Sequence, residues 1–299
     1  MKNPSAILTS DWHLREDKPT CRTDDFWEVQ WNKVDWIAEL QHQYNCPVLH
    51  AGDLFHHWKP SPYLLSTAIE HLPNKFWTVY GQHDLPQHNM DLAYKCGIFV
   101  LYKAGKIRLL PGRHWNQSFE QMNRYESTSD FLFKRVEDID INRNILVWHD
   151  FTYIGKEPFP GAKGKAHVKL EKYKQFDLIV TGDNHQSFTL RGTTGNLLVN
   201  PGNITRQSAA QIDFRPKVYL WFAETNTVEA IEIPAPYDVI TREHIEVKQE
   251  HDKRMEAYIS KMDTNWELTT NFDDNLERFF QTNRVRRQVK DIIYKCKEQ

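Results

Sequence analysis

The chain has 299 residues, of which 40% are hydrophobic and 26% are charged, and this is the composition of a soluble globular protein. Its formal net charge of -2 excludes a general polycation, so any contact with nucleic acid must come from local basic patches. No apolar run approaches the roughly 20 residues of a membrane-spanning helix, and the start MKNPSAILTSDWH lacks the apolar stretch of a signal peptide. These features predict a cytoplasmic protein without a membrane partner.

The first two-thirds of the chain alternate short apolar runs with amphipathic stretches, as α/β proteins do. Strands are expected at residues 6–8, 47–49, 76–80, 145–148 and 176–180. Helices are expected at residues 24–43 and 61–72, and the second begins with Ser at the cap and Pro at the first helical position. The stretch from about residue 98 to 144 has no clear pattern, and a loop rich in Gly, Pro and Lys is expected at roughly residues 155–167.

Later in the chain, three strands are expected in a second sheet, at residues 197–199, 218–222 and 227–233. After residue 236 the chain becomes highly charged and has a helical pattern, so we predict a main domain at 1–236 and a helical C-terminal extension at 237–299. Its expected apolar face consists of Leu276, Phe279, Phe280, Val289, Ile292, Ile293 and Cys296. Its basic end leaves three interpretations open, namely a solvated face, a DNA contact or a helix that docks on a partner.

The four cysteines are widely spread, and no two of them form a C-x-x-C pair. This spacing favours reduced thiols in or near the core over disulfides or a zinc site. The cysteines are Cys21, Cys46, Cys96 and Cys296.

Side chains that can bind metal ions follow five of the expected strands. They are Asp11 with His13, Asp53, Gln82 with His83, His149, and Asp183 with His185. Because the ligand sites of open α/β sheets lie beyond the carboxyl ends of the strands, we expect these side chains to converge. Carboxylate, imidazole and carboxamide ligands suit Mn²⁺ or a similar divalent ion. Two such ions about 3.5–4 Å apart form a clamp for in-line displacement at phosphorus.

The order of these motifs resembles that of the calcineurin-like metallophosphoesterases, which read Asp-x-His, Gly-Asp, Gly-Asn-His-Asp, His and Gly-His-x-His. The stretches AGDLFHHWKPSP and YGQHDLP are similar to the SbcD family of DNA double-strand-break repair exonucleases, and NPGN followed by Arg206 resembles that family's Asn-Pro-Gly-Ser stretch. The resemblance covers about residues 6–206. It implies an α/β sandwich of two sheets flanked by helices, DNA as a partner, an SbcC-like ATPase subunit as a second partner, and a homodimer. Under this resemblance the extension at 237–299 is either a remnant of the family's DNA-binding cap domain or the region that docks on the ATPase subunit.

The resemblance also implies two divalent metal ions, with Mn²⁺ favoured and Mg, Fe or Zn as alternatives. The residues implied for the first ion are Asp11, His13, Asp53 and His185. Asp53 would bridge to the second ion, for which Gln82, His149 and Asp183 are implied. His83 matches the family's catalytic histidine, His56 matches a histidine that positions the phosphate, and Asp84 is expected to orient the imidazole of His83.

Two positions in the stretches GQHD and TGDNHQ depart from the family's pattern, and both belong to the implied second metal site. Gln82 stands where the family has Asn, and Asp183 stands where it has His. Both residues keep oxygen donors, so we predict a second site that is altered, harder and more anionic, but working. A weakened second site with low activity is the alternative.

We therefore predict a metal-dependent hydrolase, an SbcD-like DNA nuclease that uses a metal-bound hydroxide. One alternative is a phosphodiesterase or phosphatase that acts on a nucleotide or a phosphoprotein. Another is a non-catalytic DNA-binding or scaffold subunit. In the expected loop, Lys156, Lys163 and Lys165 either contact a phosphate backbone or are simply solvated.

Overall fold

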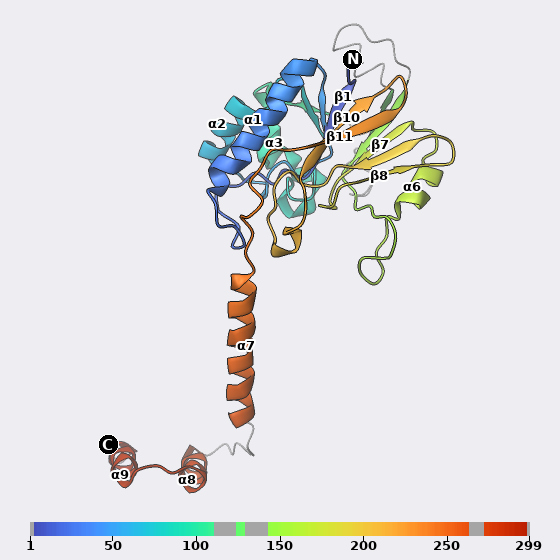
Figure 1. Cartoon of the computed structure of the whole chain (residues 1–299). Coiled ribbons are helices and arrows are strands. Elements are labelled where there is room, and N and C mark those ends of the chain that lie inside the picture. Colours follow the sequence, from blue (N-terminus) through green and yellow to red (C-terminus); the bar gives the residue numbers. More distant parts are fainter. Residues whose placement is uncertain (1–2, 111–123, 129–142, 263–271, 298–299) are drawn as a thin grey trace. The chain divides into compact units, whose positions relative to one another are not determined.

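The computed structural model describes residues 3–110, 124–128, 143–262 and 272–297 (Figure 1). The chain divides into two compact units, Met1–Arg242 and Glu243–Gln299. This division lies a few residues beyond the boundary that we placed at residue 236. All four cysteines are free, and only Cys296 among them is exposed. None of the helices in the described ranges is both long enough and apolar enough to cross a membrane.

The first unit contains a six-stranded sheet with the order β11-β10-β1-β2-β3-β4. Its strands are β1 (Ala6–Thr9), β2 (Val48–His50), β3 (Phe76–Thr78), β4 (Arg108–Leu109), β10 (Lys217–Phe222) and β11 (Thr227–Glu232). Strands β1 to β4 are parallel, and β10 pairs antiparallel with β1, with Ile7 opposite Leu220. The expectation that β10 and β11 belong to the second sheet was therefore wrong. An apolar alternation marks a strand, but it does not say which sheet edge the strand joins.

A second sheet of five strands has the order β5-β6-β7-β9-β8. Its strands are β5 (Arg124–Thr128), β6 (Asn144–Trp148), β7 (Leu178–Thr181), β8 (Phe188–Arg191) and β9 (Leu197–Asn200). Strands β6, β7 and β9 are parallel, whereas β5 and β8 pair antiparallel at the two edges. The parallel strands end at the same edge, so the residues that follow them are brought together.

Four α-helices and three short 3-10 helices complete the first unit within the described residues. They are α1 (Phe26–Tyr44), α2 (Pro62–His71), α3 (Gly97–Lys103), α6 (Ala166–Lys172), and the 3-10 helices Pro86–His88, Met90–Lys95 and Ala209–Gln211. The expected cap of α2 is confirmed, because the Ser61 hydroxyl accepts a hydrogen bond of 3.0 Å from the backbone N–H of Leu64. Helix α6 begins inside the segment that we expected to be a loop, which is therefore shorter than predicted.

Alternating side chains on the strands separate three apolar layers. One face of the first sheet, with Ile7 and Phe76, packs against α1, α2 and α3. The opposite face, with Leu8, meets Val180 and its neighbours of the second sheet. The outer face of the second sheet packs against α6 through Leu170. The first unit is thus an α/β sandwich of two sheets flanked by helices, with α1 to α3 on one side and α6 on the other (Figure 1).

The second unit is helical, as the sequence predicts. It contains α7 (Glu243–Met262), α8 (Phe272–Thr282) and α9 (Arg287–Lys297). The Lys290 ammonium of α9 donates to the Phe280 carbonyl oxygen of α8 at 3.2 Å, and the rings of Phe280 and Tyr294 lie 5.7 Å apart, edge to face. Phe280 is buried, but Phe279 and Ile292 of the predicted apolar face are exposed. Helices α8 and α9 therefore form a hairpin that leaves part of this face open.

Candidate metal centre

The first two strands end in loops whose backbone conformation is uncommon. Asp11, His13 and Asp53 have φ angles of 51°, 46° and 57°, in the left-handed region that few residues other than Gly adopt. The two loops are joined by backbone hydrogen bonds, from Asp11 N–H to the Gly52 carbonyl oxygen and from His13 N–H to the Asp53 carbonyl oxygen, both at 3.0 Å. Such conformations persist where the surrounding structure fixes them, and they cluster at functional sites.

Residues implied for the first metal ion converge on one point. The Nε2 atoms of His13 and His185 lie 3.1 Å apart, and Oδ1 of Asp11 lies 3.9 Å from the first and 4.0 Å from the second. Oδ2 of Asp53 lies 3.7 Å from His13 Nε2. Imidazole nitrogens and carboxylate oxygens that face a common point form a donor set suited to a divalent cation.

The residues implied for the second ion form two pairs, His149 with Asp53 and Gln82 with Asp183. His149 Nε2 lies 3.3 Å from Oδ2 of Asp53, while its Nδ1 lies 2.7 Å from the Ala51 carbonyl oxygen. With Nδ1 as the donor to this carbonyl, Nε2 is left as the nitrogen that can bind a metal. Gln82 Nε2 donates to Asp183 Oδ1 at 2.8 Å, and the Asp183 N–H donates to Asp11 Oδ1 at 2.9 Å.

His83 and His56 lie together at the side of this cluster. The backbone N–H of His83 donates to Asp53 Oδ1 at 2.8 Å. Its ring stacks on that of His56 with 5.6 Å between the centroids, and its Nδ1 lies 3.0 Å from the His56 carbonyl oxygen. When Nδ1 donates to that carbonyl, Nε2 is the nitrogen that can act on a substrate. Both side chains are half-buried, so the pair is accessible.

Asp84 has different partners from those that we expected. Its carboxylate accepts hydrogen bonds from the backbone N–H groups of Leu54, Phe55 and Gly81 at 3.2, 3.0 and 2.9 Å. The imidazole of His83 is instead held by the His56 carbonyl. Asp84 is buried, and this burial, together with the nearby Asp53, raises its pKa to about 7. Asp84 therefore fastens the loop after β3 to the loop after β2, which orients His83 only indirectly.

Residues 200–207 are hydrogen-bonded to the loops that contain the predicted ligands, a role that the sequence did not reveal. The Gln207 carboxamide donates to the His13 carbonyl oxygen at 3.1 Å, and the Ser10 hydroxyl donates to the Gly202 carbonyl oxygen at 3.1 Å. Asn200 donates to the Asn184 carbonyl oxygen at 2.6 Å. The NPGN stretch drew attention to this segment in the sequence. Only the structure shows that the segment is hydrogen-bonded to the loops that contain His13 and His185.

The charges at the centre are strongly coupled. Burial raises the pKa of Asp11. Burial alone would also raise the pKa of Asp53, but the neighbouring imidazoles, His149 foremost, outweigh it and hold that pKa below its usual value. Conversely, burial would lower the pKa of His149, whereas Asp53 raises it to about 10. Asp53 and His149 thus stabilise each other's charged form.

The comparisons with known proteins agree with this architecture. A model of the calcineurin-like phosphoesterase superfamily domain matches residues 6–215. The chain belongs to this superfamily. That span includes all seven residues implied as ligands and both half-buried histidines.

Three solved structures are similar to the chain at low sequence identity. A single mutant of Vps29 from Entamoeba histolytica is 13% identical, with 77% of this chain and 99% of that chain covered and a TM-score of 0.37. A metallophosphoesterase from Sphaerobacter thermophilus is 12% identical, with 77% and 89% covered and a TM-score of 0.36. A predicted phosphoesterase from Streptococcus pneumoniae is 13% identical, with 78% and 99% covered and a TM-score of 0.31. No curated protein matches the chain.

The superfamily implies divalent metal ions, and the residues present fit them. Buried polar atoms without a hydrogen-bond partner gather here, namely Asp11 Oδ2, Asp53 Oδ2 and His149 Nε2. Buried polar groups are normally partnered, so a cation at this point would satisfy all three. Asp11, Asp53 and His149 offer atoms that lie within 4.8 Å of one another, as do Asp11, His13 and His185. The individual roles assigned to these residues stay predictions.

Proposed function

We propose that the protein is a two-metal phosphodiesterase that acts on DNA, as an SbcD-like nuclease. The observation that carries the proposal is the position of His83. Its backbone N–H donates to Asp53 Oδ1, and its imidazole forms one of three metal-capable groups, with His13 and His56, beside the two groups that contain Asp11. A phosphodiester bond needs charge stabilisation at the phosphorus and help for the leaving oxygen, and this arrangement offers both.

The division of labour follows from the contacts. When bound, two ions would polarise the phosphoryl oxygens and supply a hydroxide nucleophile. Asp53 would hold both ions, because Oδ2 lies near His13 of the first group and His149 of the second. His83 would donate a proton or hydrogen bond from Nε2 to the departing oxygen, while the His56 carbonyl keeps its ring in place.

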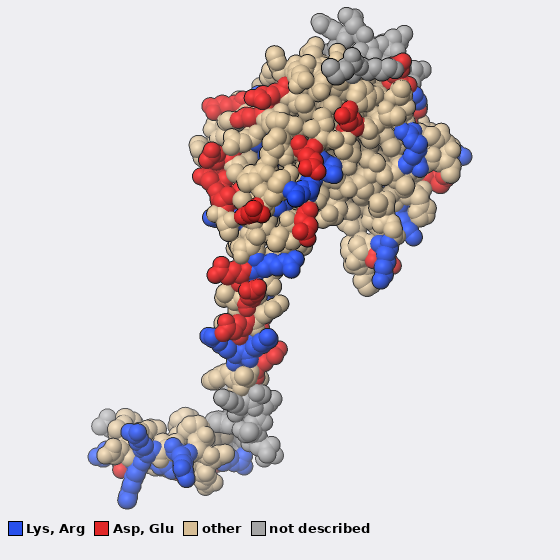
Figure 2. Space-filling model, viewed as in Figure 1, with Lys and Arg blue, Asp and Glu red and all other residues tan. Residues whose placement is uncertain are grey.

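DNA is favoured as substrate by the loop after β6, which follows His149. Phe151 and Phe159 lie with ring centroids 5.5 Å apart, and Phe159 is 53% exposed. Exposed Lys156 lies in the same loop beside exposed Glu157. Figure 2 shows both basic and acidic side chains at this loop, whereas acidic ones gather over α1 and α2. Aromatic rings interleaved with lysines suit the bases and phosphates of a single strand.

The decisive experiment is cleavage of end-labelled single- and double-stranded DNA with Mn²⁺, Mg²⁺ or EDTA. Wild-type protein should cleave with Mn²⁺ and not with EDTA. His83→Ala should abolish cleavage with its metal content nearly unchanged, whereas His57→Ala, which changes an exposed neighbour, should cleave like the wild type. A folded, metal-loaded wild type that cleaves no DNA would contradict the proposal.

The same assay separates the rival functions. A phosphodiesterase or phosphatase for small substrates would hydrolyse a nucleotide diester or a phosphopeptide but not DNA. A scaffold subunit would hydrolyse none of them. Replacing Lys156, Lys163 and Lys165 together by Gln should weaken DNA cleavage and flatten its salt dependence, because each neutralised phosphate contact contributes to the slope. Docking of an SbcC-like ATPase on the helical extension, and a homodimer, stay predictions.

A further inference from the structure

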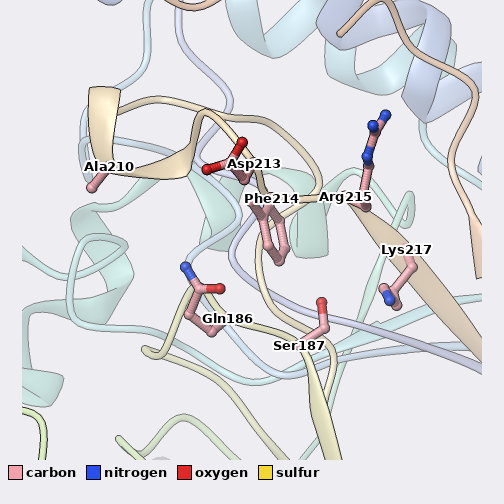
Figure 3. Close-up of a pocket in the computed structure, with 7 residues that line it drawn as sticks. All are labelled: Gln186, Ser187, Ala210, Asp213, Phe214, Arg215 and Lys217. Carbon is pink, nitrogen blue, oxygen red and sulfur yellow. The ribbon is translucent and has the colours of Figure 1, made fainter. Parts of the chain in front are cut away.

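A pocket with a volume of about 350 Å³ lies beside the loop that carries His185. Its size falls within the range of sites for small ligands, of about 300–1,000 Å³. Figure 3 shows the residues that line it, which are Gln186, Ser187, Ala210, Asp213, Phe214, Arg215 and Lys217. None of these residues was singled out by the sequence motifs.

One wall of the pocket is an extension of a ligand loop. Gln186 and Ser187 directly follow His185. The Gln186 carbonyl oxygen accepts from Asn200 Nδ2 at 2.7 Å, and the Ser187 hydroxyl donates to the Pro201 carbonyl oxygen at 2.6 Å. This wall is therefore held in place by its backbone, and the carboxamide of Gln186 is exposed.

The opposite wall is tied to another ligand loop. Gln207, whose side chain donates to the His13 carbonyl oxygen, also donates a hydrogen bond of 2.8 Å from its backbone N–H to the Gln211 side-chain oxygen. The Phe214 N–H donates to the Gln211 carbonyl oxygen at 3.1 Å. The first wall thus directly follows His185, and the second is linked to the His13 carbonyl oxygen through Gln207 and Gln211, so the pocket adjoins the predicted metal centre.

The pocket combines an aromatic face with cations. Phe214 is half-buried, and its ring extends toward Gln186 and Ser187 (Figure 3). The charged residues of the lining are the basic Lys217 and Arg215 and the acidic Asp213. The Arg215 guanidinium points away from Phe214 and lies 3.5 Å from the centroid of the Tyr237 ring. Lys217 is therefore the basic residue of the lining that can contact a ligand bound at the Phe214 ring.

We propose that this pocket binds the nucleotide next to the scissile phosphate, with its base on Phe214. An aromatic face accepts any base, and stacking is worth about 1–3 kcal/mol per base. The Gln186 carboxamide offers both a donor and an acceptor to the base edge, and Lys217 suits the adjacent phosphate. The inference rests on the proposed function and names the part of the substrate that this side of the site recognises.

The test compares oligonucleotides that carry either a base or an abasic nucleotide beside the labelled phosphodiester. Wild-type kcat/KM should be about 5- to 150-fold higher with the base, from the stacking energy. Phe214→Ala should reduce that ratio to near one, and Phe214→Tyr should restore it. Phe214→Leu keeps apolar volume without a ring and should behave like Phe214→Ala. Tyr63→Ala, which removes an exposed aromatic residue of α2, should leave the ratio unchanged.

Two outcomes overturn the inference while sparing the proposed function. One is a wild-type ratio near one, and the other is an equal loss on both substrates in Phe214→Ala, which would indicate a structural role. Titration with thymidine monophosphate tests the pocket separately when the wild type hydrolyses neither oligonucleotide. If the wild type hydrolyses no substrate, binding that Phe214→Ala abolishes would keep the pocket and overturn the nuclease proposal. Equal binding by both proteins, or by neither, would overturn the pocket.

Discussion

The Gln82 carboxamide donates a hydrogen bond to the Asp183 carboxylate, with 2.8 Å between Nε2 and Oδ1. These are the two predicted ligand positions at which the chain departs from the metallophosphoesterase pattern, and they lie 101 residues apart. The departures therefore meet in space and complement each other. The longer side chain of Gln82 reaches Asp183, and the second oxygen of Asp183 is left for a cation.

This pairing predicts that the two positions are energetically coupled. Gln82→Asn and Asp183→His should each lower kcat/KM by about 10- to 100-fold, a cost typical of disturbed metal surroundings. The double variant, which has the family's residues at both positions, should lose less than the two single losses combined, with a coupling of about 0.5–3 kcal/mol. A double-mutant cycle of DNA hydrolysis at saturating Mn²⁺ measures this. Strictly additive losses would contradict the pairing.

A substitution at Gly81 is expected to disturb the metal centre. A Cβ atom at this position would overlap the carboxylate and the backbone nitrogen of Asp53. Gly81→Ala should therefore displace Asp53 and weaken Mn²⁺ binding at least about 10-fold, as measured by calorimetric titration. Gly161→Ala is a control, because its Cβ would meet no atom within 4 Å. That variant should lose only about 1–2 kcal/mol of stability to its left-handed backbone. Unchanged Mn²⁺ affinity in Gly81→Ala would exclude Asp53 as a ligand.

Replacing Asp84 is expected to lower the stability of the folded protein. Its removal leaves three buried backbone N–H groups without their acceptor, and each such group costs about 1–3 kcal/mol. Asp84→Ala should therefore lower the free energy of unfolding in urea by several kcal/mol. Asp84→Asn keeps one acceptor oxygen and should lose less. Asp91→Ala, which removes an exposed carboxylate, should change little. Equal losses in the Ala and Asn variants would contradict this role.

Buried Lys33, which is not part of the metal centre, is expected to make the free energy of unfolding depend on pH. Burial, with Arg22 and Arg206 nearby, lowers its pKa from 10.5 to about 7, and its ammonium donates to the Ile204 carbonyl oxygen at 2.9 Å. Between these two pH values the unfolded chain binds a proton that the folded chain does not. The free energy of unfolding should therefore rise with pH in this window, by up to about 1.4 kcal/mol per pH unit.

Lys33→Met should remove this rise, whereas Lys59→Met, which changes an exposed lysine, should keep it. Urea denaturation at about pH 7.5 and about pH 9.5 measures the difference, because these values lie inside the window set by the pKa shift. Other groups titrate in both proteins, so the comparison isolates Lys33. An identical slope in wild type and Lys33→Met would show that the lysine is not desolvated.

Much of the fold follows from local patterns. Buried strands such as residues 145–148 and the cap at Ser61 have signals that lie within a few neighbouring residues. Strand β8 was missed because its residues alternate between half-buried and exposed and form no apolar run. The sheet to which β10 belongs was assigned wrongly, because its pairing with β1 joins residues over 200 positions apart. Long-range pairing leaves little trace in a local pattern.

The candidate site likewise has parts that the sequence predicts and parts that it does not. Five of the seven implied ligands, Asp11, His13, Asp53, His149 and His185, lie in groups of close metal-capable atoms, because they follow the ends of parallel strands in the two sheets. Gln82 instead contacts Asp183, whose N–H donates to Asp11. The partners of Asp84 were not predictable, since the sequence places it beside His83 while its hydrogen bonds reach Leu54 and Phe55. Phe214 has no motif around it, and only the fold brings it near the loop of His185.

The most direct test of the central claim, that the altered second site works, is anomalous diffraction from crystals grown with Mn²⁺. Two peaks bridged by Asp53 are expected. Asp11, His13 and His185 should contact one of them, and Gln82, His149 and Asp183 the other. In Asp183→Ala crystals the second peak should weaken while the first remains. A single peak in the wild type, or a second peak that Asp183 does not touch, would contradict the account.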